Sequence, residues 1–328
     1  MFKRFHRLRR TENLRELIKE REINLSNLVM PYFICEGNQK KEKINNMPNI
    51  YRYSIDNLVE VVKKGYNEYN IRTILLFGVP AKKYKREEIK SEKFFKNNLV
   101  TKAIKKIKEE LKEIVVIADV CLCSYSEEGH CGIIIDGKID NDETIKILSE
   151  IATKYAEAGA DIIAPSAMMD GQVKIIREYL DKSNYKETAI MSYSAKFASN
   201  FYTLFREAAD SSPKFGNRKS YQLDYRNINE AMREIEADID EGADIIMIKP
   251  ALSYLDVISK AKEKFNIPIA AYNVSGEYAM IKAAGEKGYI DEKEVVIEII
   301  NSIKRAGADI IITYWANEIG KWLNSKSK

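Results

Sequence analysis

Three segments of the chain repeat the pattern Gly-Ala-Asp-Ile-Ile, and this repeat restricts the folds that the sequence can adopt. The segments read EAGADIIAP at residues 157–165, EGADIIMIKP at 241–250 and RAGADIIITYW at 305–315. A stretch with apolar residues three and four positions apart leads up to the glycine of each segment, over residues 145–158, 228–241 and 292–306. This spacing predicts an amphipathic helix. The glycine ends the helix because it accepts a left-handed backbone. The isoleucine-rich run that follows predicts a strand.

Five further apolar runs resemble the strands of the repeat, and they cover residues 28–35, 73–79, 114–122, 188–195 and 267–275. None alternates with polar residues, which is typical of parallel strands covered on both faces. Strands that alternate with helices predict a parallel sheet, and eight such units predict a single closed (β/α)8 TIM barrel. A doubly wound open sheet is the alternative. It is disfavoured because no Gly-x-Gly-x-x-Gly loop follows the early strands.

Three regions of the chain are additional to a minimal barrel. Residues 1–25 precede the first strand and contain a short predicted helix at 11–19, so we interpret them as an extended N-terminal arm. Residues 81–98 form a charged insertion after the second strand. Residues 197–226 are long, mixed in composition and interrupted by Gly, Asn and Ser, as expected of a lid over an active site. The rest of residues 26–328 is expected to be one catalytic barrel domain.

Charge and cysteine content exclude several classes of protein. The 53 basic and 49 acidic residues give a net charge of +4, which is not the balance of a nucleic-acid-binding protein. The basic start MFKRFHRLRR could pack on a partner subunit, touch phosphates or lie in solvent. No apolar run reaches the ~18–20 residues of a membrane span, and no signal peptide is expected. Four cysteines in 328 residues do not form a disulfide scaffold, so a reducing, cytoplasmic location is predicted.

Most of the potential soft metal ligands lie in one segment, DVCLCSYSEEGHCG at residues 119–132. Cys121 and Cys123 follow the third predicted strand, and Cys131 returns after a short loop. Three thiolates with one open position fit a catalytic zinc site better than a closed structural one. His130 could complete the ligand set, but we favour a place beside the metal or the substrate. Unliganded buried cysteines remain the alternative.

Two lysines lie where a barrel carries its catalytic groups, at the carboxyl ends of strands. Lys196 ends the fifth predicted strand and Lys249 the sixth. Burial and a second cation nearby both lower the pKa of an ammonium group and free an amine for attack on a carbonyl. A single lysine here could equally be ion-paired or reach for solvent. Two lysines on adjacent strands favour Schiff-base chemistry.

The predicted lid adds cationic side chains, namely Arg206, Arg218 and Lys219, close to Tyr221 and Gln222. Arginine binds a carboxylate through two parallel hydrogen bonds. Any one of these residues could be a solvated surface charge. Together with the two lysines they favour a substrate that carries a carboxylate.

Taken together, these stretches resemble the porphobilinogen synthase family, also called δ-aminolevulinate dehydratase. DVCLCSY with GHCG looks like the zinc segment of that family. The other similar stretches are RLRRTENLRELI, LVMPYFICEG, SYSAKFASNFY, FREAADSSPKFGNRKSYQLD, GADIIMIKPALSYLD, AAYNVSGEYAMIKAA and RAGADIIITYWA. The resemblance covers nearly the whole chain, with the motifs in the same order.

The resemblance implies a reaction in tetrapyrrole (heme) biosynthesis. Two molecules of 5-aminolevulinate condense to porphobilinogen with loss of two waters, which is the work of a hydro-lyase. By motif match, Lys249 would hold one substrate as a Schiff base and Lys196 would bind the other. Cys121, Cys123 and Cys131 would hold the zinc, a Lewis acid for the second substrate. The presence of all three thiols implies the zinc-dependent form.

The resemblance also implies binding roles. One substrate carboxylate would be held by Arg206, Arg218 and Gln222, the other by Ser275 and Tyr314, with Asp119 and Ser166 near the amines. Glu234 aligns with a position that binds an allosteric magnesium in some bacterial relatives. The family forms homo-octamers in which the arm embraces a neighbouring subunit, so the partners expected are a small-molecule substrate and other copies of the chain, without nucleic acid or membrane.

Two other classes of protein are alternatives. A class I lysine-dependent aldolase or lyase would share the barrel and the Schiff base. It would need neither the three clustered cysteines nor the second lysine. A non-catalytic zinc-stabilised scaffold, or an RNA binder that uses its basic arm, would form no imine.

Overall fold

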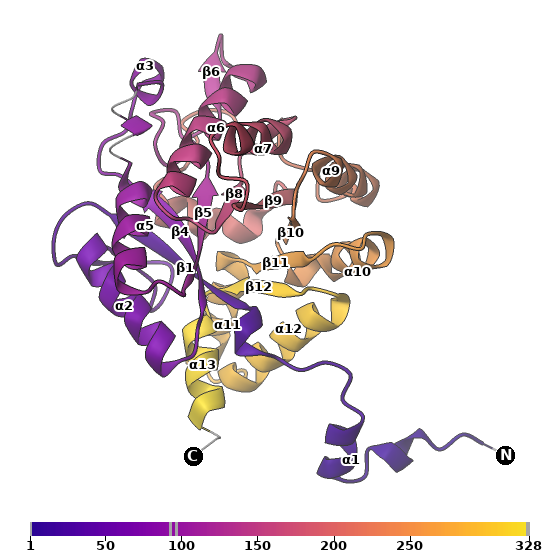
Figure 1. The fold of residues 1–328 in the computed structure, drawn as a ribbon. Helices are drawn as coiled ribbons and strands as arrows, with labels where there is room; N and C mark the ends of the chain where they lie inside the picture. The colour runs from indigo at the N-terminus through magenta and orange to yellow at the C-terminus, as the bar shows by residue number, and fades with distance from the viewer. Residues whose placement is uncertain (1, 92–93, 96–97, 326–328) are drawn as a thin grey trace.

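The chain folds around a closed barrel of eight parallel strands (Figure 1), seen in a computed structural model that describes residues 2–91, 94–95 and 98–325. The strands are β1 (Leu28–Cys35), β4 (Thr73–Val79), β5 (Val115–Val120), β8 (Ile162–Pro165), β9 (Ala189–Lys196), β10 (Ile245–Lys249), β11 (Ile269–Asn273) and β12 (Ile310–Thr313). They follow one another in chain order around the sheet, and β12 pairs back with β1 through Leu28 and Ile311. The predicted (β/α)8 barrel is therefore confirmed.

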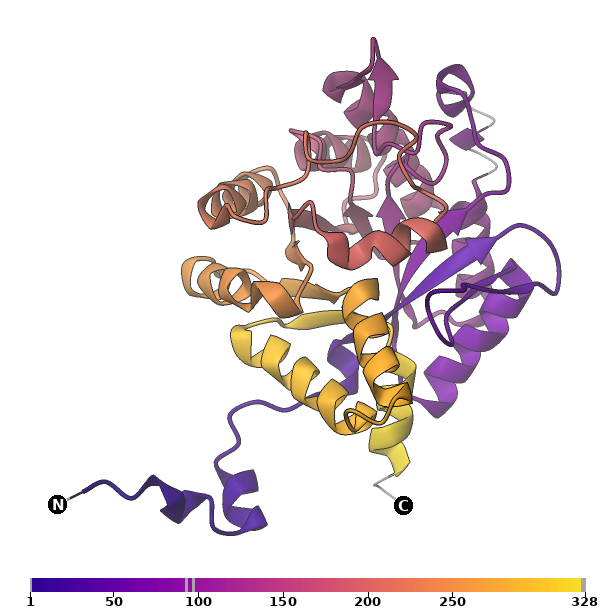
Figure 2. The ribbon, with the colours of Figure 1, turned by 180° about the vertical axis from the view of Figure 1, so that it is seen from behind.

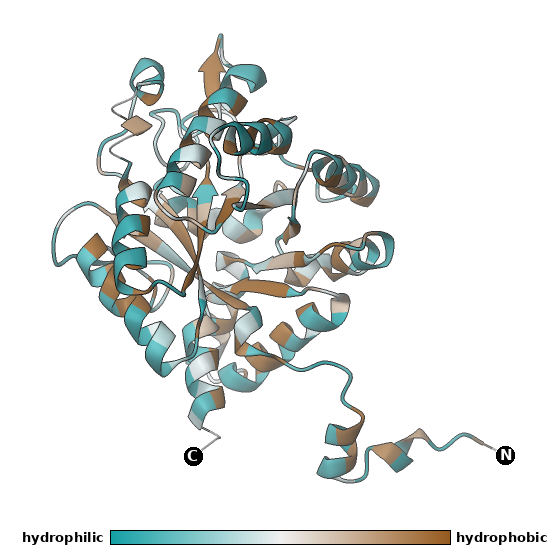
Figure 3. Ribbon diagram, in the orientation of Figure 1, coloured by the Kyte–Doolittle hydropathy of each residue, from teal (hydrophilic) through white to brown (hydrophobic). Residues whose placement is uncertain are grey.

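Helices surround the barrel, as Figures 1 and 2 show from opposite sides. They are α2 (Ile55–Glu68), α5 (Leu99–Glu110), α6 (Asn141–Glu157), α7 (Gln172–Lys182), α9 (Ile228–Asp240), α10 (Leu255–Lys264), α11 (Ser275–Glu286), α12 (Glu292–Ala306) and α13 (Ala316–Asn324). Figure 3 shows apolar residues along the strands and polar ones on much of the outer surface of the helices. This division explains the two apolar periodicities in the sequence, because strands are buried on both faces and helices on one.

The Gly-Ala-Asp repeat forms the same corner three times. Its glycines have the left-handed backbone that the sequence predicted, with φ of +102° at Gly159, +102° at Gly242 and +124° at Gly307. Its aspartates accept a backbone N–H from the start of the preceding barrel strand, over 2.7 Å for Asp161 to Val116, 2.8 Å for Asp244 to Ile190 and 3.0 Å for Asp309 to Ile269. Each aspartate thus links two adjacent strands at the amino ends, a role that the sequence pattern did not reveal.

Short additional strands lie beyond the carboxyl ends of the barrel strands. After β1, the strands β2 (Lys41–Lys43) and β3 (Tyr51–Tyr53) extend the sheet, with β3 parallel to β1. The hairpin of β6 (Ile133–Ile135) and β7 (Lys138–Asp140) follows the cysteine segment. Neither pair was predicted. Such short strands give too few residues for a clear two-residue alternation.

The predicted lid and insertion are partly helical. The lid contains the 3-10 turn η3 (Asn200–Tyr202) and the helix α8 (Thr203–Ala208). The charged insertion at 81–98 contains α3 (Arg86–Ile89), while its residues 92–93 and 96–97 lie outside the described part of the chain. Two further 3-10 turns are η2 (Leu25–Asn27) and η4 (Leu252–Tyr254).

The N-terminal segment leaves the barrel in both Figure 1 and Figure 2. It contains the 3-10 turn η1 (Phe5–Leu8) and the helix α1 (Glu12–Leu17), and neither buries a residue. The division into an arm at 1–25, a barrel domain at 26–328 and a lid at 197–226 stays a prediction, and its residues 1 and 326–328 lie outside the described part. In the described part of the chain, every helix is too short or too polar to cross a bilayer.

Candidate active site

The two predicted lysines lie side by side at the carboxyl ends of β9 and β10, where Lys196 pairs with Lys249 in the register of the strands. Lys196 is 5% exposed and Lys249 2%. Paired residues of parallel strands point to the same face of a sheet. Both amines accordingly approach the same ring, with Nζ of Lys196 5.3 Å and Nζ of Lys249 5.2 Å from the ring centroid of Tyr193.

An irregularity in β9 produces this pairing. Ser192 pairs with Ile246, and regular pairing from there would bring Ala195 opposite Lys249. The register instead shifts by one residue between Ile246 and Ile248, so that Lys196 lies opposite Lys249. A shift of one residue turns a side chain to the other face of a sheet. The bulge therefore decides that both amines lie on one face.

Aromatic rings enclose the Lys249 amine. Its Nζ lies 4.2 Å from the ring centroid of Tyr272, 4.5 Å from that of Phe205 and 5.3 Å from that of Tyr202. Burial among these rings, with Lys196 as a second cause, lowers the pKa of Lys249 to about 7. A large share of this amine is therefore neutral near pH 7, which is the form that attacks a carbonyl.

Lys196 has a polar environment instead. Its Nζ donates a hydrogen bond of 2.5 Å to the backbone carbonyl of Ser166. Asp119, on β5, lies close by: burial raises the pKa of its carboxyl to about 6, while the charge of Lys196 opposes that rise. Its Oδ1 has no hydrogen-bond partner among the described residues.

The three predicted cysteines converge just beyond β5. The ligand atoms of Cys121, Cys123 and Cys131 all lie within 4.8 Å of one another, and the Sγ atoms of Cys121 and Cys123 are 3.3 Å apart. All three side chains are buried, and none forms a disulfide. Hydrogen bonding from Cys121, and then from Cys123, holds the pKa of the Cys131 thiol well below its usual range. The group could hold a metal ion, and its all-sulfur donor set fits zinc.

His130 lies apart from this ligand set. Its Nε2 donates to the carbonyl of Phe215 over 3.0 Å, and its Nδ1 then accepts from the Tyr221 hydroxyl over 3.1 Å. Both ring nitrogens are therefore used by the lid. A place for His130 beside the metal or the substrate stays a prediction.

The lid is tied to the cysteine segment. Arg218 donates from Nη2 to the carbonyls of Gly129, over 3.0 Å, and Ser211, over 2.5 Å. Gly129 is essential to this contact, because a Cβ at this position would lie 2.2 Å from the carbonyl oxygen of Ser212 and its φ is +70°. Lys83, in the insertion, donates 2.7 Å bonds to the carbonyls of both Ser124 and Asp210. These hydrogen bonds join the lid to the cysteine segment.

Three buried donors on the lid have no acceptor within the described part of the chain, and they are Arg206 Nε, Arg218 Nε and Gln222 Nε2. The other polar end of Gln222 is occupied, since its Oε1 accepts from the Tyr202 hydroxyl over 3.1 Å. Buried donors are almost always paired in folded proteins. These three donors are therefore candidates for binding an acceptor on a ligand, such as a carboxylate.

The second predicted carboxylate site is buried behind the lid. The Ser275 hydroxyl accepts a 3.1 Å hydrogen bond from the backbone N–H of Phe205, in α8. The Tyr314 hydroxyl lies 3.2 Å from that of Tyr272. Both side chains are fully buried. These two residues therefore border the aromatic enclosure of Lys249 through Phe205 and Tyr272.

Six of the predicted site residues line one small cavity of about 20 Å³, and they are Asp119, Cys123, Ser166, Lys196, Arg218 and Lys249. No role was predicted from the sequence for the aromatic residues here. Phe77, Tyr202 and Phe205 line the cavity, and the rings of Tyr193 and Tyr272 lie near the Lys249 amine. Tyr193 and Tyr272 are close in sequence to the predicted strand ends, but an aromatic residue in a strand is far more often core than site. Only the closed barrel shows which aromatic residues of a strand belong to the site and which to the core.

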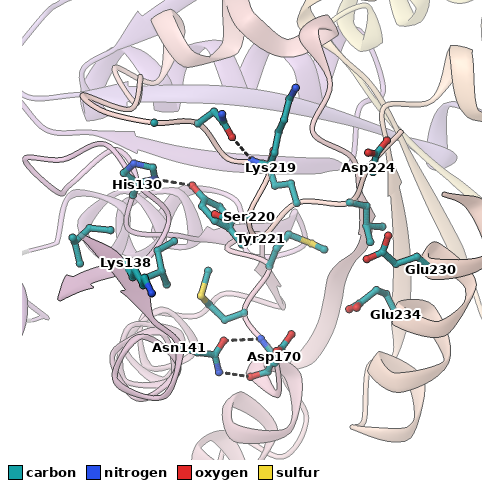
Figure 4. A pocket seen from close by; sticks show the side chains of 18 of the residues that line it. His130, Lys138, Asn141, Asp170, Lys219, Ser220, Tyr221, Asp224, Glu230 and Glu234 are labelled. Atoms are coloured by element: carbon teal, nitrogen blue, oxygen red, sulfur yellow. Dashed lines mark hydrogen bonds between the residues drawn. The ribbon is translucent and has the colours of Figure 1, made fainter. Parts of the chain in front are cut away.

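Glu234, the predicted magnesium ligand, lies elsewhere. Figure 4 shows it in a larger cavity of about 910 Å³, together with Glu230, Asp170 and Asp224. Among the described residues, Glu234 belongs to no group of three or more His, Cys, Asp or Glu side chains close enough to share an ion. Burial, followed by the charge of Asp238, raises the pKa of Glu234. The magnesium site stays a prediction.

The fold and this site define a class: a (β/α)8-barrel enzyme with two buried lysines and a three-cysteine cluster at the mouth of the barrel. Comparisons with known proteins identify the family. The sequence profile of the family "Delta-aminolevulinic acid dehydratase" matches residues 2–322. The chain belongs to this family.

Comparisons with individual proteins give the same family. Delta-aminolevulinic acid dehydratase of Methanothermus sociabilis is 53% identical over 318 residues, covering 97% of this chain and 98% of that protein. The enzyme of the same name from Bacillus subtilis is 47% identical over 326 residues, covering 98% of each. A crystal structure of the Toxoplasma gondii enzyme with its reaction product porphobilinogen superposes with a TM-score of 0.94, at 42% identity over 98% of this chain and 92% of that one.

Proposed function

We propose that this chain condenses two molecules of 5-aminolevulinate into the pyrrole porphobilinogen, with release of two water molecules. The names of its relatives and the product in the Toxoplasma gondii structure support this reaction. One observation carries the proposal: Lys196 and Lys249 are register partners on adjacent strands and both are buried. A class I aldolase needs only one such lysine.

Lys249 is proposed as the residue that binds one substrate covalently. Its neutral amine attacks the ketone carbon of 5-aminolevulinate, and the resulting carbinolamine loses the ketone oxygen as water to give an imine. The rings of Tyr272 and Phe205 exclude bulk water from this amine. The imine carbon then forms the carbon–carbon bond to the second substrate, and an amine condenses with the second ketone to release the other water. The bond between that carbon and Nζ breaks as the adjacent carbon loses a proton, which frees the Lys249 amine for the next cycle.

Lys196 is proposed to bind the second substrate. Its Nζ can donate to that substrate's ketone as it now donates to Ser166. Asp119 and Ser166, which line the same cavity, are proposed to orient the substrate amines. Two identical molecules held in different poses react as one unit, and good alignment contributes up to about 7–11 kcal/mol to such a coupling.

The unpaired lid donors support a carboxylate-binding role. Arg206, Arg218 and Gln222 are proposed to bind the carboxylate of the Lys196-side substrate. Ser275 and Tyr314 are proposed to bind the other carboxylate. Two different sets of donors are required because the product is not symmetric, so the two substrates must be held differently.

Cys121, Cys123 and Cys131 are proposed to hold the catalytic zinc. A zinc ion held by these three thiolates would supply Lewis acidity next to the second substrate. The chain itself contributes the basic neighbours: Arg218 lies beside the thiol cluster and favours the thiolate form of Cys131.

Substrate entry requires the lid to move. The cavity of about 20 Å³ between the lysines and the cysteines is large enough for about one water molecule, far less than two substrates. Because Arg218 and Lys83 link the lid to the cysteine segment, opening must break these bonds. Residues 197–226 are accordingly proposed as the lid of the active site.

Three further proposals concern assembly, magnesium and location. The arm exposes Phe2, Phe5, Leu8, Leu17 and Ile18, apolar side chains that would be covered if it embraced another copy of the chain in a homo-octamer. Magnesium is proposed at Glu234, among the acidic side chains of the larger cavity. A cytoplasmic location fits the four free cysteines. Mass photometry with and without residues 1–25, and with and without Mg²⁺, tests the first two.

The function is tested by following pyrrole formation from 5-aminolevulinate with a colour reagent for porphobilinogen, before and after treatment with a zinc chelator. We expect activity that is lost on chelation and restored by Zn²⁺. The Lys249→Ala variant is the control and should form no pyrrole while remaining folded. Absence of pyrrole formation in the zinc-loaded protein contradicts the proposal. Full activity after complete removal of metal contradicts the metal role alone.

A further inference from the structure

The carboxylate of Glu277 is the most deeply buried acidic group in α11, and it is 0% exposed. It accepts three hydrogen bonds, from two loops rather than one. Oε2 accepts from the backbone N–H of Val274 over 2.9 Å and from Nδ2 of Asn273 over 2.7 Å. Oε1 accepts from the backbone N–H of Leu252 over 2.8 Å.

Part of this arrangement is ordinary helix capping. A glutamate at the third position of a helix often accepts the backbone N–H of the N-cap residue, which here is Val274. Capping alone does not explain the bond to Leu252. That residue begins η4, in the segment that follows Lys249 at the end of β10. The carboxylate therefore joins the loop after β10 to the loop after β11.

The network extends to a third strand. Asn273, which donates to Glu277, accepts through Oδ1 a 2.9 Å hydrogen bond from the hydroxyl of Thr313, the last residue of β12. Asn273 and Thr313 are both fully buried. A single chain of hydrogen bonds thus connects the carboxyl ends of β10, β11 and β12.

These three strand ends carry groups of the site. Lys249 ends β10, Ser275 begins α11 directly after β11, and Tyr314 follows Thr313. Movement of one loop relative to another would change the separation between the amine and the hydroxyls proposed to bind the carboxylate of its substrate. Burial raises the pKa of Glu277 to about 7, a cost to the charged form that the three donated hydrogen bonds oppose.

We propose that Glu277 is a positioning residue of the reaction: it fixes the Lys249 amine relative to Ser275 and Tyr314 by joining the loops after β10 and β11. The inference rests on the proposed function, because it requires an imine at Lys249. Glu277 touches no reacting atom and acts through the backbone of Leu252 and Val274 and the side chain of Asn273.

The proposal predicts a kinetic effect that capping does not. The Glu277→Gln variant keeps the shape of the side chain but has one acceptor oxygen instead of two, so it cannot satisfy both loops. A misplacement of about 1 Å at a reacting group lowers rates by up to about 100-fold. We expect kcat to fall by roughly 10- to 100-fold in this variant, with a matching fall in the rate of imine trapping at Lys249.

Asp291→Ala provides the matched control. Asp291 caps α12 by accepting the N–H of Glu294 over 3.0 Å, so its loss removes a helix cap in the turn after the far end of α11. Both variants should melt at a lower temperature than the parent chain. In the Asp291→Ala variant, kcat and the trapping rate should stay within about twofold of the parent, because surface caps affect stability alone.

The test measures kcat, KM and the rate at which cyanoborohydride fixes 5-aminolevulinate on Lys249, all well below the melting temperature of each zinc-loaded protein. Slow trapping in Glu277→Gln with normal trapping in Asp291→Ala supports the proposal. Equal trapping rates in the two variants overturn it. If Glu277→Gln does not fold, Glu277→Asp replaces it: the shorter side chain keeps the charge but cannot span both loops, and a normal trapping rate there overturns the proposal. A parent chain that forms neither imine nor pyrrole overturns the proposed function and this inference together.

Discussion

The pH dependence of imine formation at Lys249 is the most direct consequence of the site. Burial, assisted by Lys196, lowers the pKa of Lys249 from 10.5 to about 7. At pH 7 about half of this amine is neutral, whereas an ordinary lysine would be neutral in only roughly one molecule in 3,000. The environment therefore raises the reactive fraction by about three orders of magnitude.

The direction of the pH dependence follows from which form of the Lys249 amine reacts. The neutral amine predominates above the pKa, so trapping of 5-aminolevulinate at Lys249 should rise with pH. The rate should pass from about one-tenth of its plateau at pH 6 to about nine-tenths at pH 8 and then remain flat. Lys196→Gln removes the second cause of the low pKa, so its half-maximal pH should lie above that of the parent.

The assay combines 5-aminolevulinate with cyanoborohydride at a series of pH values and quantifies the Lys249 peptide by mass spectrometry. Surface lysines of the same digest provide the internal reference, since their labelling should increase about tenfold per pH unit up to pH 9 or beyond. Labelling of Lys249 that follows the surface lysines would refute the assigned burial effect. An unchanged half-maximal pH in Lys196→Gln would show that the two amines do not interact.

Three other perturbations separate the parts of the site. Cys123→Ala should lose bound zinc, measured by elemental analysis, and most pyrrole formation, yet still form the imine at Lys249; full activity without metal would contradict this. Arg206→Ala should raise KM by about tenfold or more, as expected for a lost charged hydrogen bond of about 1.5–3 kcal/mol, and an unchanged KM would exclude a carboxylate contact. Gly129→Ala should force the lid away from the cysteine segment, because its Cβ would lie 2.2 Å from the Ser212 carbonyl oxygen; faster proteolysis within residues 197–226 checks this, and an unaltered cleavage rate would mean that the two loops are not coupled.

Local sequence patterns were enough to predict the order of the strands and helices. Eight apolar runs that alternate with amphipathic stretches, and glycines at the ends of three helices, are local patterns, and they appear as the predicted strands and corners. The same patterns put Lys196, Lys249 and the cysteines at the carboxyl ends of strands. Local periodicity suffices for this because it reflects which face of each element is buried.

The predicted boundaries of the strands were less exact than their order, for a physical reason. The predicted strand at 114–122 ends at Val120, so Cys121 and Cys123 lie in the loop beyond β5. Apolar character continues past the strand because the loop is buried against the lid. A run of buried residues cannot distinguish a strand from a buried loop.

The assembly of the site, by contrast, depends on contacts between residues far apart in the chain. The one-residue shift in β9 that faces Lys196 toward Lys249 depends on pairing between strands about 50 residues apart in the chain. The rings around Lys249 come from β9, the lid and β11, and Glu277 reaches a loop 25 residues away. These contacts form when the barrel closes, since closure fixes register and brings loops of distant sequence to one rim.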